Sequence, residues 1–113
     1  MVFQLGSTLL DACVLAILNR GDTYGYVLTQ NVKEIMSISE STLYPVLRRL
    51  QKDNCLQPYD REFQGRNRRY YAITDEGREK LRFYLDAWAE YKDKLDHILL
   101  NENKMEGIEN EQI

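Results

Sequence analysis

The sequence predicts a mainly α-helical domain with a small β component, an α+β fold in which helices accompany one β-hairpin. Apolar residues recur at helical spacing in four separate stretches. Two strand-forming runs flank a polar, glycine-containing segment near position 65. The last helical stretch repeats its apolar residues every seven positions. At 113 residues, with 43% hydrophobic and 29% charged residues, the chain has the size and composition of one globular domain.

A pair of helices is predicted at the start. Residues 7–19 form the first, and their apolar residues fall on one face at steps of three and four: Leu9, Leu10, Cys13, Ala16 and Ile17. Residues 24–35 form the second, with Thr23 as its cap. Two helices joined by a short turn are typical of a helix-turn-helix, although this arrangement alone is common in proteins of many functions.

The third helix is predicted to follow a short extended stretch at 36–38 and to run from a cap at Ser39 or Ser41 to about residue 54. At 100° per residue, its apolar residues share one face: Leu43, Val46, Leu47 and Leu50. The remaining residues form a polar and cationic face: Ser39, Ser41, Thr42, Tyr44, Pro45, Arg48, Arg49 and Lys52. Pro45 is expected to point outward within about two turns of the helix start, where the lost backbone hydrogen bond costs least.

A β-hairpin is predicted next, from strands at 55–59 and 69–73 around a flexible polar tip at 62–68. Pro58 is compatible only with an edge strand. The tip gathers cations that no core requires: Arg66, Arg68 and Arg69, beside Gly65. Helix, helix, strand, helix, hairpin and helix is the element order of a winged helix-turn-helix, in which the hairpin is the wing.

The last helix is predicted to begin after a cap at Thr74 and to run to about residue 100. Its apolar residues repeat every seven positions, at Leu81, Trp88 and Leu95 and at Tyr84, Tyr91 and Ile98. With Leu85 beside them, they predict a dimer interface made with the same helix of a second subunit. We therefore expect three parts: a DNA-binding winged helix-turn-helix at 1–74, a long C-terminal dimerisation helix at 75–101, and a disordered acidic tail at 102–113.

Charge is distributed unevenly along the chain. The net charge is −3, but residues 48–69 hold seven basic and three acidic residues, a net charge of +4. The flanking parts are acidic, at −2 for residues 1–47 and −5 for residues 70–113. One basic stretch on an acidic body indicates a local anionic partner rather than a non-specific coating of nucleic acid.

Several other classes of protein are disfavoured by the sequence. No apolar run is long enough to span a bilayer, and the N-terminal stretch lacks the basic residues of a signal peptide, so a cytoplasmic protein is expected. Cys13 and Cys55 are interpreted as reduced, buried thiols, with a disulfide or a metal pair as the alternative. No metal site, cofactor site or catalytic motif is found, and an enzyme is not expected.

Together these features predict a surface that binds double-stranded DNA. A helix fits the major groove, where side chains reach base edges, and a cationic wing suits the neighbouring phosphates. Each feature also has a plainer interpretation. Pro45 could merely be tolerated near a helix start instead of lying against a groove wall or a thymine methyl group, and Arg48 and Arg49 could belong to an ordinary solvated helix face. The arginines of the wing favour nucleic acid.

The runs STLYPVLRRLQKDNCL and GRNRRYYAITDEGREKL resemble the PadR-like transcriptional regulators, specifically the short form with a single C-terminal helix. GDTYGYVL at 21–28 fits the second-helix opening of the same family, and the resemblance spans roughly residues 5–100. It implies a dimeric repressor that reads a pseudo-palindromic operator with two recognition helices and two wings. Asn54 departs from the family, in which a glycine usually ends the recognition helix, but asparagine also tolerates the left-handed conformation.

The resemblance to multidrug-sensing short members also implies a small aromatic effector between the subunits, bound by Ala12, Leu85, Trp88 and Leu95. Trp88 would be a stacking plate for a planar ligand, and the alternative is a tryptophan that fills the dimer seam. Two rival functions stay open at this point. One is a winged-helix module that binds proteins and has lost DNA binding, which the cationic wing disfavours, and the other is a ligand-binding protein without affinity for DNA.

Overall fold

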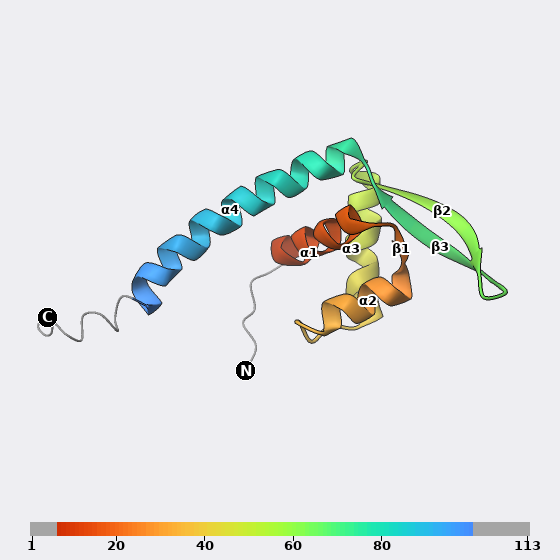
Figure 1. The fold of residues 1–113 in the computed structure, drawn as a ribbon, viewed down its shortest axis with the longest axis horizontal. Helices are drawn as coiled ribbons and strands as arrows, with labels where there is room; N and C mark the ends of the chain where they lie inside the picture. Colours follow the sequence, from red (N-terminus) through yellow and green to blue (C-terminus); the bar gives the residue numbers. More distant parts are fainter. Residues whose placement is uncertain (1–6, 101–113) are drawn as a thin grey trace, which may run out of the picture. The chain divides into compact units, whose positions relative to one another are not determined.

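The structure is a computed structural model that describes residues 7–100 (Figure 1). In this range the helices are α1 (Ser7–Arg20), α2 (Gly25–Lys33), α3 (Glu40–Lys52) and α4 (Asp75–Leu99). The strands are β1 (Thr23–Tyr24), β2 (Leu56–Phe63) and β3 (Arg66–Ile73), which form one antiparallel sheet in the order β1-β3-β2. The predicted mainly α winged helix-turn-helix with a long C-terminal helix is confirmed. The expected tail at 102–113 lies outside the described residues.

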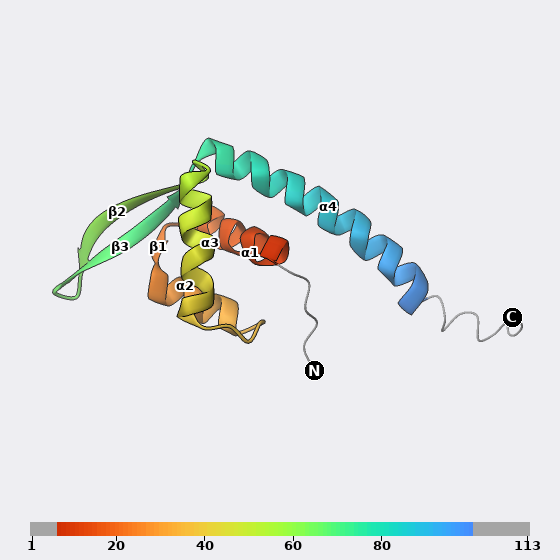
Figure 2. The same ribbon diagram turned by 180° about the vertical axis from the view of Figure 1, so that it is seen from behind.

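The chain divides into two compact units, one ending at Arg82 and the other beginning at Phe83. The first unit contains α1, α2, α3, the sheet and the first turns of α4, and the second contains the rest of α4. In Figure 1 the three short helices lie together and the hairpin of β2 and β3 extends beyond them. Figure 2 shows the same unit from behind, with α3 visible along its length.

The core lies where α1, α2 and α3 pack against one another and against the base of the hairpin. In α3 the buried side chains are the four expected ones: Leu43, Val46, Leu47 and Leu50. In α1 the prediction holds for Leu10 alone, because the other buried apolar side chains are Val14, Leu15 and Leu18, whereas Leu9, Cys13, Ala16 and Ile17 are half-buried. This helix is apolar around most of its circumference, so periodicity does not single out the buried face.

The expected strand at 36–38 does not form, and the third strand of the sheet is β1, which precedes α2. Thr23 pairs with Tyr71 and Tyr24 pairs with Tyr70. Thr23 is therefore a strand residue rather than the cap of α2, and Tyr24, at the cap position, makes no side-chain hydrogen bond to the helix. One edge of β3 is open to this pairing because β2 occupies only the other edge.

The hairpin is longer and its turn tighter than predicted. The strands pair in register as far as Phe63 opposite Arg66, and the turn contains only Gln64 and Gly65. Both turn residues have positive φ angles, 54° and 77°, as required by the tight turns that match the twist of a hairpin. The arginines expected on a flexible tip thus lie on a hydrogen-bonded strand. Pro58 lies on the edge strand β2, as predicted.

A compact junction joins the end of α3 to the start of α4. Thr74 caps α4 as predicted, since its Oγ1 accepts a hydrogen bond of 3.0 Å from the Gly77 amide. The same hydroxyl donates to the Asn54 carbonyl oxygen over 2.7 Å, and the Thr74 amide donates to the Cys55 carbonyl oxygen over 3.0 Å. Asn54 has a φ of 65°, the left-handed conformation expected for it.

Both cysteines are free thiols. Cys55 is buried, as predicted, and Cys13 is half-buried. Burial raises the pKa of each thiol, which disfavours the reactive thiolate. We conclude that neither cysteine has the environment of a nucleophile.

Candidate nucleic-acid interface

The outward face of α3 presents most of the side chains that the sequence assigned to DNA. The exposed residues are Ser39, Ser41, Thr42, Tyr44, Pro45, Arg48, Arg49 and Lys52. At the helix start three hydroxyls associate, with Ser39 Oγ 2.8 Å from Ser41 Oγ and 3.4 Å from Thr42 Oγ1. The amphipathic division of α3 thus leaves a continuous polar surface opposite the core.

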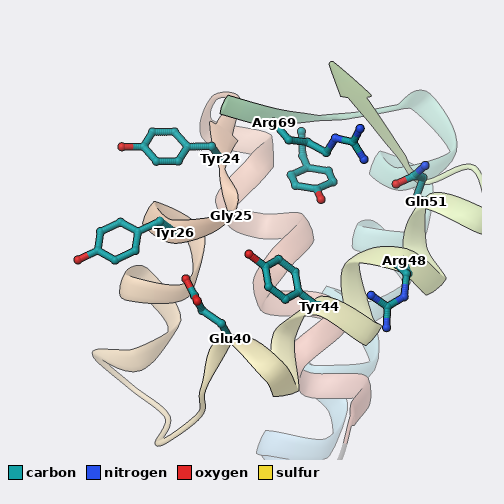
Figure 3. Close-up of a pocket in the computed structure, with 9 residues that line it drawn as sticks. Tyr24, Gly25, Tyr26, Glu40, Tyr44, Arg48, Gln51 and Arg69 are labelled. Carbon is teal, nitrogen blue, oxygen red and sulfur yellow. The ribbon is translucent and has the colours of Figure 1, made fainter. Parts of the chain in front are cut away.

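A pocket of about 550 Å³ lies beside this face, between α3, the start of α2 and strand β3 (Figure 3). Its lining combines tyrosines, two arginines and a few polar residues: Tyr24, Gly25, Tyr26, Glu40, Tyr44, Arg48, Gln51, Arg69 and Tyr71. Figure 3 shows Tyr44 projecting from α3 toward Gly25, whereas Tyr24 and Tyr26 point away from Tyr44. A Cβ atom on Gly25 would lie 3.6 Å from the Tyr44 ring, so α2 begins in close approach to that ring.

The charge of this pocket suits an anion. Arg48 comes from α3 and Arg69 from β3, so two guanidinium groups reach one concavity from different elements. Burial raises the pKa of Tyr71, and the positive charges of Arg69 and Arg48 oppose that rise. Glu40 is the carboxylate among the lining residues.

The wing has two chemically different faces because successive residues of a strand point to opposite sides. Arg69 lines the pocket beside α3 and lies 3.7 Å from Asp60 in an ion pair. Arg68 lies on the other face, 4.7 Å from the centre of the Tyr24 ring and 5.7 Å from that of Phe63. These stacked positions hold the Arg68 guanidinium in place by cation–π attraction.

Arg61 completes the aromatic face of the wing, 5.2 Å from the centre of the Tyr70 ring, which also stacks on Tyr59 at 5.6 Å. Tyr59 donates a 2.7 Å hydrogen bond to Asp22, which ties the edge strand to the turn before β1 and raises the pKa of Tyr59. Gly65 and Arg66 are exposed at the turn. The predicted cationic cluster is thus divided between two surfaces.

Arg49 differs from the other predicted DNA-binding residues. Its guanidinium forms an ion pair with Asp11 of α1 instead of accompanying Arg48 into the pocket. Arg49 and Arg48 are neighbours in a helix and therefore point about 100° apart. Arg48 and Arg49 therefore point to different surfaces, whereas the sequence suggested a single shared surface.

Sequence reasoning missed six lining residues of the pocket: Tyr24, Gly25, Tyr26, Glu40, Gln51 and Tyr71. The TYGY segment carries only a weak signal, because glycine is tolerated at a helix start and does not by itself indicate a pocket. The pairing of Tyr71 with Thr23, which draws this segment to the recognition helix, leaves no such signal in the sequence.

The residues predicted for the dimer and effector sites are distributed over both units. Leu81 is buried in the first unit, at 5% exposure, and therefore has little surface left for a partner. In the second unit Trp88 is 41% and Ile98 64% exposed, Leu85 and Tyr91 are also exposed, and Tyr84 and Leu95 are half-buried. Trp88 and Tyr91 approach with ring centres 6.0 Å apart. Ala12 is half-buried on α1 of the first unit.

Over residues 7–100, no three histidine, cysteine or acidic side chains are grouped as a metal ion would require. Within the same range no helix combines the length and the apolar character needed to cross a bilayer.

Comparison with known proteins gives consistent matches. The family model described as the transcriptional regulator PadR-like family matches residues 14–83. The crystal structure of smu.1704 from Streptococcus mutans is 41% identical, with a TM-score of 0.84 over 88% of this chain and 93% of that one. A PadR-like transcriptional regulator from Bacillus cereus is 29% identical, with a TM-score of 0.77 over 82% of this chain and 93% of that one.

Bacillus subtilis PadR, solved in complex with operator DNA, shares the fold at 23% identity and a TM-score of 0.61, over 68% of this chain and 46% of that one. The family match covers most of the winged helix-turn-helix and the first turns of α4, including all residues that line the pocket. Members of this family are transcriptional regulators rather than enzymes. The chain belongs to the PadR-like family of transcriptional regulators.

Proposed function

We propose that this regulator binds double-stranded operator DNA in the cytoplasm as a homodimer, represses transcription there, and is released by a small aromatic effector. The observation that carries the DNA-binding part is the pocket that Arg48 of α3 and Arg69 of the wing both line, beside the exposed face of α3. Two cations held at one concavity of an otherwise acidic chain suit a backbone phosphate.

The start of α2 adds to this phosphate site. The first amides of a helix carry partial positive charge, and Tyr24 leaves them without a side-chain cap. Gly25, the first residue of this helix, and Tyr44 line the same pocket as the two arginines. A phosphate seated there would fix α3 against the duplex.

The outward residues at the start of α3 would contact the bases, because this end of a recognition helix is the one that reaches base edges. We assign this role to Ser41, Thr42, Tyr44 and Pro45, with Ser39 beside them. Lys52 near the end of α3, and Arg66 and Arg68 with Gly65 on the wing, would contact flanking phosphates. The ring-stacked Arg68 enters the complex already ordered and therefore loses less entropy on binding.

We expect Arg48→Ala and Arg66→Ala each to weaken DNA binding. Because each variant loses one phosphate contact in each subunit of the proposed dimer, the slope of log affinity against log salt should flatten by about 1.8. The measurement is fluorescence anisotropy at several salt concentrations, with duplexes from the promoter region of the protein's own gene and a scrambled duplex of equal length.

Arg78→Ala is the matched control, since Arg78 is an exposed arginine of α4 that pairs with Asp75 and lies outside the proposed surface. It should bind DNA as the wild type does. If Arg48→Ala and Arg66→Ala also keep the wild-type affinity and slope, the assigned surface is wrong. A protein without measurable DNA affinity would instead be a protein-binding or ligand-binding module.

The dimer is proposed from the apolar surface of the second unit. Leu85, Trp88, Tyr91 and Ile98 are exposed in a single chain. Trp88 and Leu95, and likewise Tyr91 and Ile98, are seven residues apart along α4. A helix that exposes so many large apolar residues is expected to bury them against a partner. The same helix of a second subunit offers the matching heptad pattern.

Trp88 gives the effector part of the proposal its test, because it is the only tryptophan of the chain. We expect planar aromatic cations and phenolics to quench its fluorescence, and calorimetry to show the loss of their binding in Trp88→Ala. A ligand between the subunits should change the spacing of the recognition helices, which must match half-sites one helical turn, about 34 Å, apart.

Operator should therefore weaken ligand binding by about 5- to 150-fold, the usual range for coupled sites. This arm of the experiment uses phenolics only, because a planar cation would itself bind the duplex. Tyr26→Phe, which changes a tyrosine far from Trp88 in sequence and in the other unit, is the control and should leave the ligand affinity unchanged. If quenching were the same with and without operator, the ligand site would not be coupled to DNA binding.

A further inference from the structure

Asp11 is a carboxylate in the interior of the first unit. It lies on α1, is 5% exposed, and has the buried side chains of Leu10, Val14 and Leu15 on the same turns of helix. A buried carboxylate is unfavourable unless a cation and hydrogen bonds compensate for the lost water. Arg49 of α3 supplies this compensation through its ion pair with Asp11.

The partner of Asp11 belongs to the helix proposed to read DNA. Arg49 follows Arg48, which lines the pocket, and precedes Lys52, which is exposed one turn later. The side chain of Arg49 is itself 43% exposed, so it lies at the rim of the core rather than deep inside it. An arginine at that rim has the length to reach either α1 or a phosphate beside α3.

We propose that Asp11 withholds Arg49 from DNA and in this way limits sequence-independent binding. This inference rests on the proposed function. Contacts to phosphate carry no sequence information and supply nearly all non-specific affinity, so each cation added to the surface raises binding to every duplex. Holding Arg49 on α1 leaves Arg48, Lys52 and the wing to contact phosphates. Asp11 is thus a positioning residue that improves the ratio of specific to non-specific affinity.

The test replaces Asp11 and measures how many phosphates the protein contacts. In Asp11→Ala the guanidinium of Arg49 loses its ion pair with Asp11 and is expected to contact the duplex. We expect higher affinity for a scrambled duplex and a salt slope steeper by about 1.8, because one cation is released in each subunit of the dimer. Between 50 and 200 mM salt this steeper slope corresponds to an additional loss of affinity of roughly twelvefold. A merely structural role for Asp11 would lower thermal stability without changing the slope.

Asp11→Ala/Arg49→Met is the matched variant, because it has the same change in α1 and lacks the released cation. It removes both charges of the ion pair instead of one, so it should be destabilised less than Asp11→Ala. We expect its salt slope to equal that of the wild type. If Asp11→Ala does not fold, the double variant can still refute the inference, since a flatter slope in it would mean that Arg49 contacts phosphate in the wild type.

The outcomes separate this inference from the proposed function. A wild type that shows no salt-dependent affinity for any duplex would refute DNA binding itself. A wild type that binds DNA, with the same slope in Asp11→Ala and in the double variant, would refute only the withholding of Arg49. A steeper slope in Asp11→Ala, together with a wild-type slope in the double variant, supports it.

Discussion

Gly77→Ala is expected to destabilise the protein by about 2 kcal/mol, even though alanine is the better helix former. A Cβ atom at this position of α4 would lie 2.3 Å from the Cys55 carbonyl oxygen and 2.7 Å from Ile73 Cγ1. The clash exceeds the gain in helix propensity, which is about 1 kcal/mol. Thermal unfolding followed by circular dichroism should show a midpoint lower by about 10 °C.

The neighbours of Gly77 are poorly able to move away, because the clash is with backbone and that backbone is tied on both sides. The Cys55 carbonyl oxygen accepts the amide hydrogen of Thr74, and the Thr74 hydroxyl bridges the Asn54 carbonyl oxygen and the Gly77 amide. A displacement that relieves the clash therefore lengthens at least one of these hydrogen bonds. Local hydrogen bonds of this kind each contribute about 1 kcal/mol.

Gly21→Ala is the control for the general effect of replacing a glycine. A Cβ atom there meets nothing within 4 Å, and Gly21 lacks the positive φ of Gly65. Its stability should therefore stay within about 0.5 kcal/mol of the wild type. If Gly77→Ala proved as stable as Gly21→Ala, the junction between α3 and α4 would be loose rather than closely packed.

The recognition helix could be predicted from the sequence because its two faces differ strongly in polarity. Leu43, Val46, Leu47 and Leu50 lie within one arc, and every residue between them is polar, aromatic or proline. Only one orientation of such a helix buries its apolar side chains, the one in which the apolar arc faces the core. The pattern does not specify the partner of each cation, and Arg49 consequently has a role that Arg48 does not share.

In α1, by contrast, the buried face could not be predicted from the sequence. Apolar residues occupy most of its circumference, so several faces satisfy a spacing of three and four. The buried face includes Asp11, which polarity alone would place outside. Its burial depends on the cation of α3, 38 residues later in the chain, and no local pattern announces a pair at that separation.

The wing and the pocket depend on strand pairing that the sequence does not reveal. The sequence indicates two strands and a turn, yet it does not show that pairing continues up to Gln64 and Gly65. Only the full register places Arg68 and Arg69 on opposite faces. In the same way, the two-residue strand β1 is too short to detect, and without it Tyr24 and Gly25 have no evident connection to the recognition helix.

Leu95→Asp is expected to dissociate the proposed homodimer and, with it, to abolish tight operator binding. Leu95 lies among the exposed apolar residues of α4, between Tyr91 and Ile98 on the heptad seam. An aspartate there would be buried without a cation when two subunits associate, which costs several kcal/mol. A monomer offers one recognition helix and one wing, so the second half-site no longer adds to the affinity. Sedimentation velocity at micromolar concentration measures the assembly, and anisotropy with the operator duplex measures its consequence.

Ala89→Asp is the matched control, because it places the same charge on an exposed position of the same helix, about 100° from Trp88 and away from the seam. Helix propensity changes in the same direction in both variants, so a loss of α4 itself would affect them alike. We expect Ala89→Asp to remain dimeric and to bind operator as the wild type does. Dissociation in both variants would point to a general weakening of α4, whereas a wild type that sediments as a monomer would refute the proposed dimer. Only the apolar seam predicts that the two aspartates, six residues apart, give opposite results.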